Sequence, residues 1–156
     1  MSMGQGNPLV ERAIRVLVID DDVAVLGAVR SMIEALRPHW RAEYVYDSQE
    51  AVRSLRAERY DAILSDIHMP GLDPASVLTQ AKSTSPSTPV VLFSGYRDRY
   101  TKTARTLGAF AVLAKPIDID SLITTLENAI FSRTISPMVG PTSCETRGAI
   151  SPEISY

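Results

Sequence analysis

The sequence has little that would suit a secreted, membrane or nucleic-acid-binding protein. Its one cysteine, Cys144, excludes an internal disulfide and argues against a zinc site built on cysteines. No apolar run approaches the roughly 18 residues that cross a bilayer, and residues 1–7 lack the apolar stretch of a signal peptide. The net charge of −2 provides no general attraction for nucleic acid or anionic lipid. We therefore expect a cytoplasmic protein that contacts neither membrane nor nucleic acid directly.

The composition is that of one globular domain with two flanking segments. The 156 residues are 45% apolar and 22% charged, which suits a single core that needs no disulfides. Residues 1–11 show no periodicity and are expected to form a flexible leader. More than half of residues 132–156 are Ser, Thr, Pro or Gly, so we expect a disordered tail. The folded domain is expected to span residues 12–131.

Short apolar runs alternate with helical patterns along residues 12–131. The apolar runs are typical of buried strands and occur at residues 16–19, 62–64, 90–93 and 111–113. Residues 42–46 alternate more and suit an edge strand. Helical spacing of apolar residues fills the intervals, as at residues 25–36 and 122–130. This order predicts an α/β protein, a doubly wound five-stranded parallel sheet with helices on both faces.

Polar residues follow the apolar runs at four places. Asp20, Asp21 and Asp22 follow the run at residues 16–19. Asp66 and Ser94 end the strands that contain the runs at residues 62–64 and 90–93. Lys115 and Pro116 follow the strand that contains the run at residues 111–113. Since ligands of doubly wound sheets bind at the carboxyl ends of the strands, we expect these residues to converge on one rim.

The chemistry of this set suits phosphoryl transfer. Neighbouring carboxylates repel one another, and a hard cation such as Mg²⁺, which prefers carboxylate oxygens, relieves the conflict. One carboxylate can then attack phosphorus and form an acyl phosphate. The ammonium of Lys115 and the hydroxyl of Ser94 can stabilise the phosphoryl oxygens.

Four segments together resemble the receiver domain of two-component response regulators. They read Val-Ile-Asp-Asp-Asp at 18–22, Ser-Asp-Ile-His-Met-Pro-Gly at 65–71, Phe-Ser-Gly at 93–95 and Ala-Lys-Pro at 114–116. The resemblance covers residues 12–131 and has all four motifs in order, each at a strand end. It implies a flavodoxin-like (βα)5 fold with the strand order 2-1-3-4-5.

The resemblance also implies a role for each acidic residue. Asp66 would be the phosphoacceptor. Asp20, Asp21 and Asp66 would hold Mg²⁺ or Mn²⁺, with Asp21 the more direct ligand of the first pair. The backbone carbonyl of His68 would be a further metal ligand. We expect Asp22 to cap the following helix and not to bind the metal.

The same resemblance assigns the remaining site residues. Ser94 would donate a hydrogen bond to a phosphoryl oxygen, and Lys115 would pair with the phosphoryl group. The bond between Lys115 and Pro116 is expected to be cis, as is usual in the family. His68 and Tyr96 flank the expected path of the attacking water, so we hypothesise that they tune the lifetime of the phosphoryl group.

The function implied is a phosphorylation-dependent signalling switch. The phosphoryl donor would be a histidine kinase or a histidine phosphotransfer protein, and a downstream protein effector would respond to the shifted conformation. The domain would promote its own phosphorylation and dephosphorylation and would not be a metabolic enzyme. A homodimer is compatible with the resemblance. One departure is Val112, where the family often has Tyr or Phe.

Two other functions fit parts of the sequence. Asp20 and Asp22 form a DxD pattern, which is the nucleophile motif of phosphohydrolases of the haloacid-dehalogenase type. That function would leave the Asp66 segment unused. The second alternative is a pseudo-receiver, a docking module that carries no phosphate. Val112 favours it, whereas the complete acidic set and Lys115 oppose it.

Overall fold

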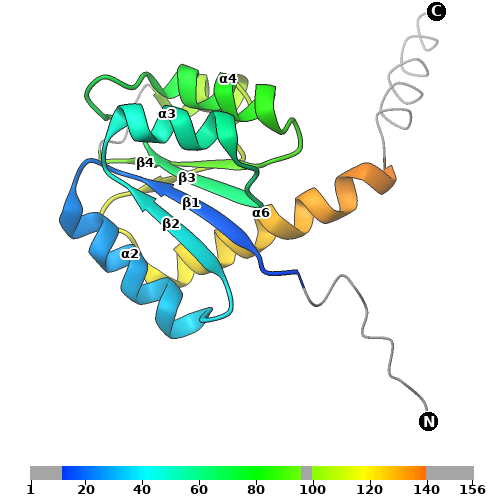
Figure 1. Ribbon diagram of the computed structural model, residues 1–156, viewed down its shortest axis with the longest axis horizontal. Helices are drawn as coiled ribbons and strands as arrows, with labels where there is room; N and C mark the ends of the chain where they lie inside the picture. The colour runs from blue at the N-terminus through cyan, green and yellow to red at the C-terminus, as the bar shows by residue number, and fades with distance from the viewer. Residues whose placement is uncertain (1–11, 96–99, 140–156) are drawn as a thin grey trace, which may run out of the picture.

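The computed structural model describes residues 12–95 and 100–139, with residue 100 and residues 134–139 described by their backbone only. Strands and helices alternate along the chain (Figure 1). The strands are β1 (Arg15–Ile19), β2 (Arg41–Val45), β3 (Ala62–Asp66), β4 (Val90–Ser94) and β5 (Ala111–Ala114). The helices are α2 (Val23–Leu36), α3 (Ser48–Ala57), α4 (Pro74–Thr84), α5 (Tyr100–Thr106) and α6 (Ile119–Val139).

The five strands form one parallel sheet in the order β2-β1-β3-β4-β5. The predicted fold class and strand order are therefore confirmed. The three central strands are almost entirely buried, while β2 and β5 lie at the edges and are more exposed. Burial on both faces explains why the central strands are continuous apolar runs without alternation.

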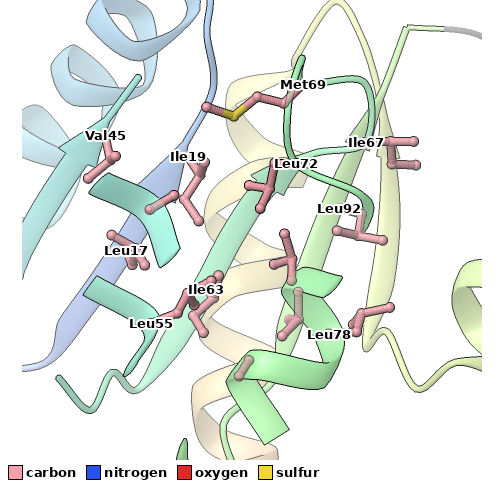
Figure 2. Close-up of a cluster of buried hydrophobic side chains, with 14 of the residues drawn as sticks. Leu17, Ile19, Val45, Leu55, Ile63, Ile67, Met69, Leu72, Leu78 and Leu92 are labelled. Carbon is pink, nitrogen blue, oxygen red and sulfur yellow. The ribbon is translucent and has the colours of Figure 1, made fainter. Parts of the chain in front are cut away.

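Two hydrophobic clusters fill the space between the sheet and its helices. One packs α3 and α4 on the first face of the sheet, around residues such as Leu17, Ile63 and Leu92 (Figure 2). The other packs α2 and α6 on the opposite face, around Val18 and Phe93. Neighbouring residues of one strand belong to different clusters because side chains alternate between the two faces.

Local signals set the helix boundaries. The carboxylate of Asp22 accepts a hydrogen bond from the backbone N–H of Ala24 and caps α2. This confirms the prediction that Asp22 is a cap. Helix α2 ends at Leu36, shortly before Pro38, and α4 begins at Pro74, where the missing N–H of proline costs no hydrogen bond.

Helix α6 differs from the expected boundary of the domain. It continues to Val139, eight residues beyond the predicted end of the domain at residue 131. The content of Ser, Thr and Pro suggested an irregular tail, but helix propensity is a weak prior, and a helix whose first turns are already formed extends at little further cost. The leader, residues 1–11, and residues 140–156 of the tail lie outside the described part of the chain.

Val112 stands where the family often has Tyr or Phe, and the aromatic residue two positions before it in the sequence, Phe110, is not buried in its place. Val112 is half-buried and packs against the cluster under α3 and α4. Phe110 is 39% exposed, so it does not take the place of a buried ring.

Over the described residues, no helix combines the length and the apolar character needed to cross a membrane.

Candidate phosphoacceptor site

The carboxyl ends of four strands place the expected site residues at one rim of the sheet. Asp20 directly follows β1, Asp66 and Ser94 are the last residues of β3 and β4, and Lys115 directly follows β5. The parallel register pairs Asp66 with Phe93 and Ser94 with the residue before Lys115. The convergence expected from the sequence is therefore found in the structure.

Three carboxylates gather at this rim. Asp20, Asp21 and Asp66 each offer an oxygen, and these oxygens all lie within 4.8 Å of one another. Asp20 is fully buried and Asp66 is 6% exposed, whereas Asp21 is exposed. Three oxygen ligands with one open side suit a cation such as Mg²⁺, which keeps several of its water molecules.

Lys115 joins two of these carboxylates. Its Nζ donates to Asp20 Oδ2 over 2.9 Å and lies 3.4 Å from Asp66 Oδ1. Its backbone N–H donates to the carbonyl of Ser94 over 2.8 Å, which ties the loop to β4. The bond between Lys115 and Pro116 is cis, as the resemblance predicted. The ammonium therefore stands beside Asp66, the carboxylate that the resemblance implies is the phosphoacceptor.

Burial and charge shift the pKa values of two of these groups. Burial raises the pKa of Asp20, and the hydrogen bonds from the Asp22 N–H and from Lys115 lower it by less. Burial lowers the pKa of Lys115, but the hydrogen bond to Asp20 and the charges of Asp20 and Asp66 raise it by more. Opposite charge therefore outweighs desolvation at Lys115 but not at Asp20, where a further cation would favour the ionised carboxylate.

The side chains of the other predicted residues have contrasting environments. Ser94 is 3% exposed at the end of β4, whereas the side chain of His68 is exposed. The backbone N–H of His68 donates to Asp66 Oδ1 over 3.2 Å, so the loop after β3 helps to orient that carboxylate. Tyr96 lies outside the described residues. The structure thus brings the predicted site residues together apart from Tyr96, and their chemical roles remain predictions.

A turn between Met69 and Leu72 supports this loop. Met69 and Leu72 are both buried, and the backbone N–H of Leu72 donates to the carbonyl of Met69 over 3.1 Å. Figure 2 shows both side chains within the cluster beneath the rim. Gly71 has φ +77°, and a Cβ on it would lie 3.0 Å from the hydroxyl of Ser48. A Pro-Gly pair is a signal for this kind of turn.

Comparisons with known proteins agree with this geometry. Residues 16–127 match the family model for the response regulator receiver domain. The chain is 30% identical over 120 residues to the transcriptional regulatory protein ZraR of Escherichia coli, and this match covers 75% of the chain and 26% of ZraR. It is 32% identical over 116 residues to the DNA-binding transcriptional regulator NtrC of Proteus hauseri, covering 74% of the chain and 24% of NtrC.

Solved structures show the same fold. A receiver domain protein from Clostridium thermocellum superposes with a TM-score of 0.71 at 26% identity, over 78% of this chain and 98% of that one. The receiver domain of a putative LuxO repressor from Vibrio parahaemolyticus gives 0.74 at 18% identity, over 82% of this chain and 98% of that one. The chain spans about a quarter of the length of the two regulators. The family match, the strand order and the acidic rim agree: the chain belongs to the response regulator receiver domain family.

Proposed function

We propose that Asp66 accepts a phosphoryl group and that Asp20, Asp21 and Asp66 hold the divalent cation that the reaction needs. Phosphorylation-dependent switching is the role of the receiver family to which the chain belongs. The observation that carries the assignment is the position of Lys115 between Asp20 and Asp66, beside the cluster of three carboxylates. The carboxylate cluster fits Mg²⁺ or Mn²⁺, because both prefer oxygen ligands.

The transfer proceeds by attack of a carboxylate oxygen of Asp66 on the phosphorus of a phosphohistidine. The new O–P bond forms as the N–P bond breaks, and the electron pair of the broken bond stays on the imidazole. The cation that Asp20, Asp21 and Asp66 would hold would supply positive charge beside the phosphoryl oxygens. The product is an acyl phosphate on Asp66, and attack of water on its phosphorus releases inorganic phosphate and restores the carboxylate.

The side chains around Asp66 have distinct tasks in this reaction. Lys115 is held at 3.4 Å from Asp66 Oδ1 and pairs with the incoming phosphoryl oxygens. The hydroxyl of Ser94 donates a hydrogen bond to one of them. The N–H of His68 holds the carboxylate in place before transfer. The domain promotes its own phosphorylation and dephosphorylation, and this chemistry serves signalling.

A histidine kinase or a histidine phosphotransfer protein is the proposed donor, and a protein effector is the proposed output. The relatives ZraR and NtrC are named as transcriptional regulators, and this chain matches about a quarter of their length. The proposed effector would recognise the surface that phosphorylation shifts.

The phosphohydrolase alternative is not favoured by the structure. Its DxD motif would need Asp22 beside the reacting carboxylate. The Asp22 carboxylate instead accepts the Ala24 N–H over 2.9 Å as the cap of α2, and Asp22 is not among the three clustered carboxylates. A docking module that carries no phosphate would not need the three clustered carboxylates and Lys115 to converge, so the structure does not favour that alternative either.

Removal of the divalent cation tests the proposed function directly. With acetyl phosphate and Mg²⁺, the protein is expected to gain the mass of one phosphoryl group. An excess of EDTA is expected to reduce the initial rate of uptake by at least about 100-fold, because the phosphoryl charge then faces three carboxylates. The measurement is intact-mass spectrometry over time. Equal uptake with and without chelator, or no uptake with Mg²⁺, would refute the proposal.

The hypothesis for His68 concerns the lifetime of the phosphoryl group. Truncation in His68→Ala opens the space beside the path of the attacking water, so the phosphorylated protein is expected to lose its phosphoryl group about threefold faster. The matched control is His39→Ala, because His39 is the only other histidine and is also exposed. Unchanged decay in His68→Ala, measured after removal of acetyl phosphate, would remove His68 from this role.

A further inference from the structure

A third buried carboxylate, apart from Asp20 and Asp66, lies at the end of the sheet opposite the acidic rim. Asp61 directly precedes β3 and is 4% exposed. Its Oδ1 accepts hydrogen bonds from the guanidinium groups of both Arg12 and Arg133. Its Oδ2 accepts the backbone N–H of Arg15 over 2.8 Å. One side chain therefore joins the segment before β1 to the later turns of α6.

The two arginines contribute unequally to this cluster. The side chain of Arg12 is 66% exposed, whereas that of Arg133 is 22% exposed. Water and salt screen an exposed ion pair, but they screen a mostly buried pair much less. Arg133 Nε is also buried and lacks a hydrogen-bond partner among the described residues. The pairing with Asp61 thus stabilises a half-buried guanidinium whose Nε has no other compensation.

Helix α6 spans the distance between the two ends of the sheet. It begins at Ile119, four residues after Lys115, and its 21 residues extend over about 30 Å. Figure 1 shows α6 crossing one face of the sheet and continuing past the end at which β1 begins. Buried side chains such as Leu126 and Ala129 hold the first part of the helix to the core, but Phe131 is 65% exposed. Ile130 still packs partly against the core, whereas Phe131 and Ser132 are exposed, and Arg133 lies about one turn beyond Ala129.

We propose that Asp61 is a latch residue: through its pair with Arg133 it ties the later turns of α6, residues 130–139, to the amino-terminal end of the sheet. While Arg133 is paired with Asp61, α6 moves as one rigid body with the domain. When the pair is broken, residues 130–139 move independently of it. The latch therefore determines whether a change near Lys115 is carried along α6 to Val139. This inference does not depend on phosphorylation of Asp66.

Hydrogen exchange of the full 156-residue chain tests the latch. In Arg133→Gln, the amides of residues 130–139 are expected to exchange about tenfold faster than in the wild type. In the wild type, local opening of these turns must break the pair of Arg133 with Asp61, and in the variant this cost is absent. The amides of residues 119–128 are expected to keep their protection, since their apolar contacts are intact. Asp61→Asn is expected to act in the same direction.

Arg12→Gln is the matched control, because Arg12 binds the same oxygen of Asp61 but is largely exposed. Its exchange over residues 130–139 is expected to stay within about twofold of the wild type. If Asp61→Asn fails to fold, Arg133→Gln still decides the question. Unchanged exchange in Arg133→Gln, or an equal change in Arg12→Gln, would overturn the proposal. Phosphoryl uptake measured on the same Arg133→Gln sample is expected to be normal, so the outcome is independent of the proposed function.

Discussion

Replacement of Asp66 by Asn is expected to abolish uptake of a phosphoryl group from acetyl phosphate. An amide is a poor nucleophile toward phosphorus, and it also removes one of the three clustered carboxylates that would hold the cation. We expect the initial rate to fall by at least about 1000-fold, which corresponds to about 4 kcal/mol in the barrier. Intact-mass spectrometry in the presence of Mg²⁺ measures this rate.

Asp73→Asn is the matched control for this experiment. Asp73 lies in the same loop, is exposed, and makes no side-chain hydrogen bond at the start of α4. The control variant is expected to take up phosphoryl groups at the wild-type rate. A phosphoryl group found on Asp66→Asn at a comparable rate would show that another residue is the acceptor.

The second large effect is expected from Lys115→Ala. Without the ammonium, Asp20 is left fully buried with no cation at 2.9 Å, and Asp66 loses a contact at 3.4 Å. Removal of one partner from a buried ion pair costs about 3–5 kcal/mol. We expect a smaller loss of unfolding free energy, about 2 kcal/mol at pH 7 without divalent metal, because the Lys115 side chain is 23% exposed. Urea denaturation in EDTA measures it.

The stability difference between wild type and Lys115→Ala should depend on pH in a defined way. Burial already raises the pKa of Asp20, and loss of Lys115 raises it further above the unfolded value of about 4. Ionisation of Asp20 then destabilises the folded variant as the pH rises through that raised pKa. The difference should be small below about pH 4 and complete near neutrality. In the wild type, the pKa of Lys115 is raised, so its contribution is lost only above about pH 10.

Two controls separate this result from a general effect of losing a lysine. Lys102→Ala removes an exposed lysine from α5 and is expected to leave the unfolding free energy within about 0.5 kcal/mol of the wild type. Addition of Mg²⁺ is expected to restore part of the stability of Lys115→Ala, because the cation can compensate Asp20 and Asp66. A pH-independent loss would mean that lost packing, and not lost charge, explains the change.

The central strands and the rim were predictable because the relevant signals are local. Each buried strand is a short apolar run, and each site residue stands where such a run ends. Parallel pairing then brings Asp20, Asp66, Ser94 and Lys115 together without further information. The cap at Asp22 was predictable for the same reason, since its carboxylate bonds only two residues ahead.

The supports of the site were not predictable in this way. Met69 and Leu72 look like ordinary loop residues until the packing of α3 and α4 buries them beneath the rim. The extension of α6 was missed because its composition resembles an irregular tail. In the sequence, Asp61 looks like an ordinary acidic residue in a loop before a strand. Its side-chain partners, Arg12 and Arg133, lie 49 and 72 positions away.

The amino-acid sequence was enough to predict the alternation of strands and helices and the residues that meet at the rim. These depend on periodicity and on positions adjacent in the chain, and short-range physics governs both. Three features became visible only in the folded protein. Asp20 is fully buried, and Lys115 contacts both Asp20 and Asp66. Asp61 joins Arg12 to Arg133. Burial, distance and the pKa shifts that follow from them arise from contacts between residues far apart in the sequence, which no local pattern specifies.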